Sequence, residues 1–369
     1  METSGEVATE MGSGIAPGSV VDISDIEVIA PNFKKRLSGV TSTIVQLIPV
    51  QRAKGQKIAV LGPGLPSHLP HIRYADLAAL WSPPSGRRAR VWHARRNIEM
   101  LPGLFMRDVL RMPLKLLFTS AAQRTHSAWT RFLISKMDAV VATSARSGSY
   151  LKVPYKVVHH GVDLDLFRPS GPSDPSSPAD GFGKHLIGCF GRVRHQKGTD
   201  LFVRALIELL PSYPEWTGVV CGRVTPDNKV FGDALKADVA MSGLTDRILF
   251  MGEVDDIKPW YRRLSLYVAP SRNEGFGLTP LEAMASGTAV VASDAGAYSE
   301  MIVEGETGSV VPAGDYTALR DALRTYFENP ALAGQQGWSG REHVRVAFAI
   351  EKEANSLAEI YETLLETRP

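Results

Sequence analysis

Cysteine and long hydrophobic runs are scarce in this sequence. Its 369 residues include two cysteines, Cys189 and Cys221, which are too few for a disulfide framework or a zinc site. Both lie in apolar, strand-like runs, where a thiol is expected to act as a small buried hydrophobe. No apolar run approaches the roughly 18 residues that a membrane-spanning helix needs. The sequence therefore argues against an integral membrane protein.

The first 22 residues lack the features of a signal peptide. They are small and acidic, without a basic start or an apolar stretch, so we expect a disordered extension. On this basis the protein is predicted to stay in the cytoplasm.

Two nucleotide-binding motifs are missing as well. A dinucleotide dehydrogenase carries G-x-G-x-x-G directly after its first strand, but a single glycine follows the strand expected at 26–30. The phosphate loop G-x-x-x-x-G-K-[ST] is absent too. The D-x-D formed by Asp163 and Asp165 suits a turn better than a metal–nucleotide site. Hydride transfer and ATP chemistry are therefore disfavoured, and we expect no metal.

A low-complexity stretch at 169–184 divides the chain. Pro, Ser, Gly and Asp replace large apolar residues there, which is typical of a linker. On either side, β-branched runs alternate with amphipathic segments, the pattern of parallel βαβ units. We therefore predict an α/β protein with two doubly wound Rossmann-like domains, 23–168 and 185–340, each binding ligands at the carboxyl ends of its strands. The expected strands are 26–30, 57–61, 90–94, 114–120, 138–144, 155–161, 185–191, 217–222, 247–252, 264–270, 288–293 and 308–312.

The net charge of +2 hides an uneven distribution. From 31 to 168 there are 22 Lys and Arg against six Asp and Glu, an excess of 16 positive charges. From 169 onward the net charge is −8. Such a basic half favours an anionic partner, which could be a nucleic acid, a membrane surface or a phosphorylated acceptor.

The stretch G-R-V-R-H-Q-K-G follows the strand expected at 185–191. It places Arg192 and Lys197 in one loop, before a helix that Thr199 or Asp200 could cap. Helix amino ends attract phosphate, and two cations beside one would bind a diphosphate through charge-assisted bonds. Exposed loop cations with no ligand are the alternative interpretation.

The stretch E-G-F-G-L-T-P-L-E at 274–282 predicts a loop and then a helix. Thr279 would be the N-cap and Glu282 its capping-box partner, so a structural role is enough to account for Glu282. Glu274 has no such structural role, while Gly275 and Gly277 would let the backbone approach a ligand. A polyhydroxylated anion would use both carboxylates and the backbone amides.

These motifs resemble those of the retaining glycosyltransferases of family 4, which have the GT-B fold. The stretch at 274–282 matches their E-x7-E motif, and residues 191–198 are similar to their arginine and lysine loop. Residues 38–40, 161–167 and 252–256 also resemble family blocks in the expected order. The amino-terminal part is most similar to bacterial mannosyltransferases that build the inner core of lipopolysaccharide on Kdo.

The resemblance implies a role for each matching residue. Glu274 would contact the hydroxyls of the transferred sugar, Glu282 the nucleotide ribose, and Arg192 and Lys197 the donor diphosphate. Glu274, Arg192 and Lys197 are thereby the predicted catalytic residues. The predicted donor-binding set is Gly39, Arg192, Lys197, Val254, Glu274, Gly275, Phe276, Gly277, Leu278 and Glu282.

The resemblance also implies the reaction. Mannose would pass from GDP-mannose to Kdo-lipid A with retention of configuration and without a metal, on the cytoplasmic face of the inner membrane. The two domains would face a central cleft, and one helix at 341–365, within a terminal segment 341–369, would cross back to the first domain. A GT-B sugar-nucleotide epimerase and a non-catalytic nucleic-acid-binding protein remain alternatives, although no nucleic-acid recognition motif is found.

The acceptor side is predicted from basic residues and one histidine. Family members often carry a sugar-contacting histidine after the strand at 114–120, where this chain has Ser120, Ala121 and Ala122, and His126 follows six residues after Ser120. We expect Arg95, Arg96 and His126 to contact the acceptor. Arg107 and Arg111 are spaced to share one face of an interfacial helix, although a solvated basic face is equally compatible.

Overall fold

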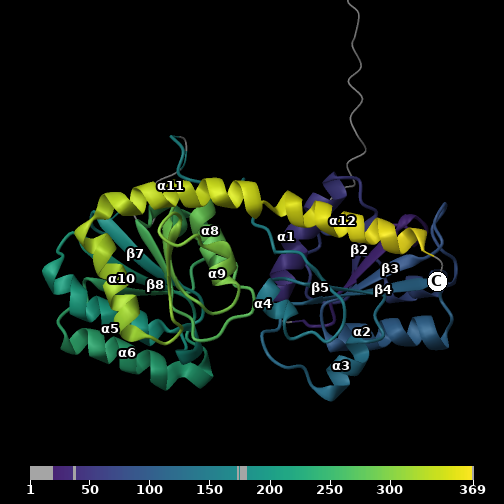
Figure 1. Cartoon of the computed structure of the whole chain (residues 1–369), viewed down its shortest axis with the longest axis horizontal. Coiled ribbons are helices and arrows are strands. Elements are labelled where there is room, and N and C mark those ends of the chain that lie inside the picture. The colour runs from purple at the N-terminus through teal and green to yellow at the C-terminus, as the bar shows by residue number, and fades with distance from the viewer. Residues whose placement is uncertain (1–19, 36–38, 173, 175–180, 368–369) are drawn as a thin grey trace, which may run out of the picture. The chain divides into compact units, whose positions relative to one another are not determined.

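A computed structural model describes residues 20–35, 39–172, 174 and 181–367 (Figure 1). Most of the extension expected at 1–22, and residues 173 and 175–180 of the expected linker, lie outside the described residues. None of the helices in the described ranges is both long and apolar enough to cross a membrane.

The first sheet has the strand order β2-β1-β3-β4-β5-β6. β1 pairs in parallel with β2 and β3, and β3 pairs in parallel with β4. All six strands predicted before the linker are present, with ends shifted by a few residues. Their bounds are Val28–Pro31, Ile58–Leu61, Arg90–Ala94, Leu114–Ser120, Ala139–Ala142 and Lys156–Val157.

The second sheet has the order β12-β11-β10-β7-β8-β9, with parallel pairing throughout. The chain runs from β7 outward to β9 and then returns to β10 on the other side of β7. This reversal is the switch point at which open α/β sheets bind ligands. The bounds are β7 His185–Phe190, β8 Trp216–Cys221, β9 Ile248–Gly252, β10 Leu266–Ala269, β11 Ala289–Ser293 and β12 Gly308–Val311.

The helices lie between the strands, as βαβ units require. In α10, for example, Asp315 accepts a bond from Ala318 N at the helix start, and Leu319 and Leu323 point into the core. The helices are α1 Gly39–Ala53, α2 Asn97–Leu104, α3 Ala128–Ile134, α4 Ala145–Gly148, α5 Thr199–Leu209, α6 Lys229–Met241, α7 Lys258–Arg263, α8 Thr279–Ala285, α9 Tyr298–Met301, α10 Tyr316–Glu328, α11 Pro330–Ala347 and α12 Ile350–Glu366.

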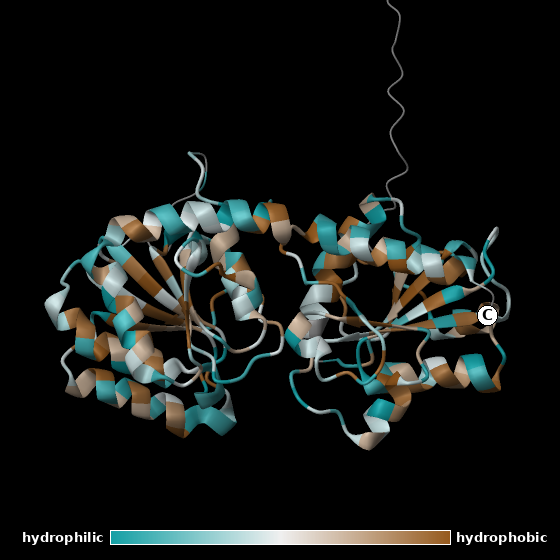
Figure 2. Cartoon of the chain, viewed as in Figure 1, coloured by the Kyte–Doolittle hydropathy of each residue, from teal (hydrophilic) through white to brown (hydrophobic). Residues whose placement is uncertain are grey.

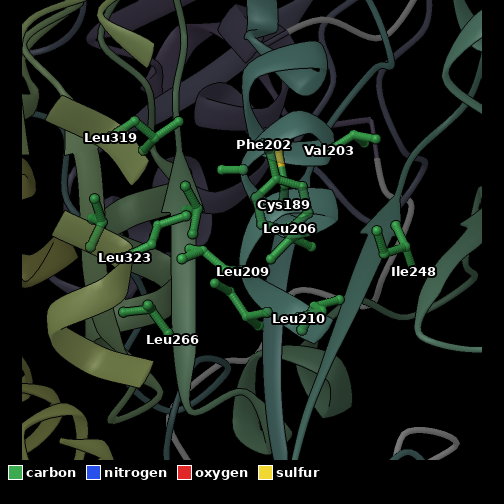
Figure 3. Packing of buried hydrophobic residues seen from close by; sticks show 14 of the residues in the cluster. Cys189, Phe202, Val203, Leu206, Leu209, Leu210, Ile248, Leu266, Leu319 and Leu323 are labelled. Carbon is green, nitrogen blue, oxygen red and sulfur yellow. The ribbon is translucent and has the colours of Figure 1, made fainter. Parts of the chain in front are cut away.

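Apolar side chains cover both faces of the second sheet, whose strands are mostly brown in Figure 2. On one face, Phe202 and Leu206 of α5 pack near Cys189 of β7 (Figure 3). Cys189 and Cys221 are both free and buried, as predicted. Burial raises the pKa of each thiol to about 12, so neither is a reactive thiolate near neutral pH.

The chain divides into two compact units. One comprises Met1–Phe118 with Ala358–Pro369, and the other comprises Thr119–Leu357. The end of α12 therefore belongs to the first unit, as the predicted return of the terminal helix requires. There Tyr361 Oη lies 2.7 Å from Nδ1 of the buried His93, and Arg87 pairs with Glu362 at 2.7 Å.

The expectation of one continuous helix at 341–365 is wrong. α11 ends at Ala347 and α12 begins at Ile350. Between them, Val162 N donates to Phe348 O at 2.9 Å and Ile350 N donates to Val162 O at 3.1 Å. These backbone bonds to a distant segment replace helical hydrogen bonds. No sequence pattern within 341–365 predicts this break in the helix.

The expectation that Arg107 and Arg111 share a helix face is also wrong. α2 continues as a π-turn, η3 (Phe105–Val109), and ends there. Arg111 lies beyond it with φ 56°, in the left-handed region. Helical spacing therefore cannot be applied to this pair.

Candidate donor site at the switch point of the second sheet

The loops that follow β7 and β10 meet at the carboxyl edge of the second sheet. Arg272 N donates to Gln196 O at 2.9 Å, which joins the two loops through their backbones. Gly198 makes the approach possible, because it has φ 70° and an added Cβ would lie 1.9 Å from Pro270 O. Both motifs predicted from sequence lie in these two loops.

We expect Gly198→Ala to destabilise the protein more than a matched change at another left-handed glycine. Gly243 has φ 72°, but the position that a Cβ would take there is open, so Gly243→Ala should cost about 1 kcal/mol from backbone strain alone. Gly198→Ala should cost about 1–3 kcal/mol more through the clash with Pro270. Urea unfolding of both variants measures the difference; equal losses would contradict the close approach.

Lys197 and Glu274, predicted separately, are brought into contact. Lys197 Nζ bonds Glu274 Oε2, and the two side chains are 20% and 17% exposed. Gly275 N donates to Glu274 Oε1 at 3.1 Å, and Tyr298 Oη donates to Oε2 at 3.4 Å. The ion pair and these two donors fix the carboxylate at the end of the β10 loop.

Two arginines accompany this pair in the β7 loop. Arg192 is exposed, as a residue that contacts a ligand should be. Sequence reasoning missed Arg194, whose Nε is buried without a hydrogen-bond partner among the described residues. Burial and the charge of Arg192 lower the pKa of Arg194. The sequence signal was available, since Arg194 lies between the two predicted cations.

Neither Thr199 nor Asp200 caps α5. The N-cap is Gly198, and no side chain bonds the first turn. Asp200 instead forms two bonds with Arg272, at 2.7 and 2.8 Å. Burial raises the pKa of Asp200, but the bonds to Arg272 outweigh it and bring the pKa below its usual value. This pair is a second link between the loops, made by residues far apart in sequence.

Glu282 does not form the predicted capping box. α8 starts at Thr279 with Leu278 as N-cap, and no side chain accepts from its first turn. The Glu282 carboxylate instead accepts from Tyr261 Oη at 2.9 Å. Burial raises the pKa of Glu282 to about 7, although Tyr261 and Lys197 lower it. The tyrosine comes from α7, which explains why the local pattern was misleading.

The raised pKa of Glu282 predicts a pH dependence of stability. A carboxyl that holds its proton better in the folded state stabilises the protein fully below its unfolded pKa of about 4.3, and this contribution is lost as pH rises through about 7. Between pH 5 and 8, the parent should lose about 2 kcal/mol more than Glu282→Gln. Urea unfolding at both pH values measures this; parallel curves would contradict the shift.

The remaining predicted donor residues have differing environments. Phe276 is buried, and Gly277 has φ 85° with no room for a Cβ, which would lie 2.4 Å from Tyr298. Val254 and Leu278 are partly buried against the core on this face of the second sheet. Gly39 is the exposed first residue of α1 and belongs to the other unit, while Ser38 lies outside the described residues.

Two of the predicted acceptor residues, Arg95 and Arg96, belong to the first unit. Arg96 bonds Asn32 and Glu99, both at 2.8 Å, and its side chain is only 12% exposed, so it holds its own unit together. Arg95 donates from its side chain to His93 O at 3.3 Å.

His126 belongs to the unit that contains the donor loops. Its Nε2 lies 3.4 Å from Ser120 Oγ. Burial, followed by the charges of Arg124 and Arg131, lowers the pKa of His126.

Asp163 Oδ1 accepts from Asp165 N at 2.9 Å, which confirms the turn predicted for that pair.

Comparison with known proteins decides the family. Residues 184–329 match the family model described as glycosyl transferases group 1. The chain is 65% identical over 345 residues to the lipopolysaccharide core biosynthesis mannosyltransferase LpcC of Rhizobium leguminosarum bv. viciae, covering 93% of this chain and 98% of that protein. The chain belongs to the lipopolysaccharide core mannosyltransferase family.

Other relatives of this mannosyltransferase agree. LpsB of Rhizobium meliloti (strain 1021), another lipopolysaccharide core biosynthesis mannosyltransferase, is 55% identical over 353 residues, covering 94% of this chain and 100% of that protein. The predicted resemblance to the lipopolysaccharide core mannosyltransferases is confirmed, and the chain is a glycosyltransferase.

Solved structures confirm the GT-B fold. Anabaena Alr3699/HepE in complex with UDP has a TM-score of 0.79 at 18% identity, covering 92% of this chain and 100% of that one. Sucrose-phosphate synthase from Thermosynechococcus elongatus has a TM-score of 0.74 at 21% identity, covering 91% and 98%.

Proposed function

We propose that this enzyme transfers mannose from GDP-mannose to the Kdo of a lipid A-linked acceptor, with retention of configuration and without a metal ion. The observation that supports this most is the contact between Lys197 and Glu274 at the switch point of the second sheet. A cation suited to a diphosphate and a carboxylate suited to sugar hydroxyls lie side by side there. The names of the relatives add mannose and the lipopolysaccharide core.

The donor diphosphate would lie against the loop after β7. Breaking the bond between sugar and phosphate builds negative charge on the leaving diphosphate, and pre-placed cations stabilise that charge in the transition state. Arg192 and Lys197 would do this, with Arg194 as a third positive charge in the same loop. The acceptor hydroxyl would attack from the leaving-group face, and a phosphate oxygen would take its proton.

The two glutamates would hold different parts of the donor. Glu274 would accept from hydroxyls of the mannose, and Glu282 would accept from hydroxyls of the ribose, while Val254 would lie near the base. Tyr261, which bonds Glu282, would orient that carboxylate.

The acceptor would be anionic and linked to lipid. The excess of positive charge over 31–168 suits the carboxylates of Kdo and the phosphates of lipid A. Arg95, Arg96 and His126 remain the residues proposed to contact it. A cytoplasmic enzyme that reaches such an acceptor would bind peripherally to the cytoplasmic face of the inner membrane.

The donor and the reaction are tested together by calorimetry and a transfer assay. We expect tight binding of GDP and GDP-mannose, transfer of one mannose to Kdo-lipid A seen by mass spectrometry, and undiminished activity in EDTA. Preference for UDP, which the Anabaena neighbour binds, would overturn the proposed base. Turnover of the nucleotide sugar without an acceptor would favour the epimerase.

Glu282 also predicts how donor binding depends on pH. A carboxylate that accepts from ribose should bind best when ionised, and the pKa of Glu282 is about 7. GDP affinity should therefore fall several-fold, and at most about tenfold, from pH 8 to pH 6. The phosphate of GDP titrates in the same range, so the comparison is with Glu282→Gln, whose pH dependence should be shallower. Identical calorimetric profiles would remove Glu282 from the ribose site.

A further inference from the structure

The outward face of α2 and η3 is apolar. Ile98, Leu101, Phe105 and Val109 are 45%, 50%, 51% and 62% exposed, and their spacing of three or four residues puts them on one side of the segment. Within 97–109 the one further exposed residue is Asp108, which forms an ion pair with its neighbour Arg107. Figure 2 shows brown segments along this helix.

The inner side of the same segment is apolar apart from one carboxylate. Met100, Leu104 and Met106 are buried there, and the fully buried Glu99 bonds Arg96 at 2.8 Å. The segment is thus apolar on both sides, whereas an ordinary surface helix has polar residues outward. α10 of the same chain is ordinary, because its exposed residues are all polar: Thr317, Asp321, Thr325 and Glu328.

An exposed tryptophan and an exposed cation extend this face. Trp81, at the end of η2 (Tyr74–Trp81), is 53% exposed and donates from Nε1 to Leu110 O at 2.8 Å. Its indole is thus anchored beside the end of η3 with its N–H satisfied, which suits an apolar–water boundary. Arg111 follows directly, exposed and in the left-handed region.

We propose that this face, defined by Trp81, Ile98, Leu101, Phe105 and Val109, binds the surface of an anionic phospholipid bilayer. It deepens the proposed function, because a lipid-linked acceptor lies in the same plane as those phospholipids. The apolar side chains would enter the boundary between headgroups and acyl chains, and the surrounding cations would bind the headgroups.

Charge complementarity selects a lipid surface over a protein partner. Between 80 and 115 the chain has eight Lys and Arg against Glu99 and Asp108, and both of these carboxylates are paired with arginines. Arg90 is buried and Arg87 pairs with Glu27 and Glu362, but Arg88 and Arg111 are exposed. The exposed charge around the apolar face is therefore positive. Anionic bilayers attract exposed cations near their surface.

The test is co-sedimentation with vesicles of phosphatidylglycerol and phosphatidylethanolamine, compared with phosphatidylcholine alone. The full-length protein should bind the anionic vesicles in a salt-dependent way and bind the neutral ones weakly. Leu101→Asp with Phe105→Asp should weaken binding at least tenfold, because both side chains are half exposed in the free protein. Leu101→Ser with Phe105→Ser is a milder pair that introduces no negative charge.

Val230→Asp with Met241→Asp is the matched control. These residues are 85% and 79% exposed on α6, far apart along one helix, and their replacement should leave vesicle binding unchanged. Equal binding by both double variants, or equal binding of the parent to neutral vesicles, would overturn the proposal. Self-association of the parent that Leu101→Asp with Phe105→Asp abolishes would identify a protein interface and overturn it as well.

Transfer to a water-soluble acceptor containing Kdo separates this inference from the proposed function. The Leu101→Asp with Phe105→Asp variant should retain the parent's rate on the soluble acceptor while losing vesicle binding. If it lost both, the face would be part of the active enzyme's fold and the proposal would fail. If the parent transferred no mannose but bound vesicles as expected, only the proposed function would fail.

Discussion

Glu274→Ala is expected to lower the rate of mannose transfer about 10²-fold at saturating donor and acceptor, while GDP still binds. Its carboxylate would contact sugar hydroxyls more strongly in the transition state than in the ground state, so its loss lowers turnover. Because the structure pairs it with Lys197, its removal also frees a cation. GDP binding should therefore be unchanged or tighter. Calorimetry and steady-state kinetics measure the two effects.

Glu342→Ala is the control for this change. Glu342 is an exposed carboxylate on α11 that pairs with Arg345, so its removal should leave the rate unchanged. Glu274→Gln should restore little activity, since an amide accepts hydroxyl bonds less strongly than a carboxylate. A Glu274→Ala enzyme with nearly the parent's turnover would exclude Glu274 from the catalytic site.

Lys197→Ala is expected to reduce turnover roughly 10²-fold or more and also to weaken GDP binding. Two effects add here. The leaving diphosphate loses a cation, and Glu274 is left as an uncompensated negative charge beside it. Arg192→Ala removes a cation alone, so it should weaken GDP binding less than Lys197→Ala does. Calorimetry with GDP and the transfer rate compare the two variants.

The charge-reversed double variant separates catalysis from structure. Lys197→Glu with Glu274→Lys keeps an ion pair between the loops. It puts a carboxylate where the diphosphate needs a cation, and a cation where the sugar hydroxyls need an acceptor. It should fold like the parent and remain inactive. Lys229→Ala, which breaks the exposed pair with Asp233, should have no effect on rate. Recovery of activity in the double variant would show that the pair is structural.

The fold could be predicted because its signals are local. A buried parallel strand needs only a short β-branched run, and the twelve runs found in the sequence correspond to the strands of the two sheets among the described residues. The E-x7-E motif and the arginine and lysine loop could be located for the same reason: each is a contiguous stretch whose position after a strand places it at one sheet edge.

The errors came from partners that are distant in sequence. Glu282 suits a capping box by spacing, but its carboxylate accepts from Tyr261 and the helix begins without a side-chain cap. Asp200 suits an N-cap, but Arg272 takes its carboxylate. The break between α11 and α12 depends on backbone bonds from Val162.

By itself, then, the sequence determined the class of fold and the order of elements, because these follow from spacing and side-chain type. It also located the residues proposed to bind the donor, through motifs that resemble those of a known family. The tertiary structure decided which groups meet. It paired Lys197 with Glu274, raised the pKa of Glu282 to about 7 by burial, and turned an apolar helix face outward. Hydrogen bonding and desolvation depend on which groups are close in space. These neighbours come from segments far apart in the sequence, so no local pattern predicts them.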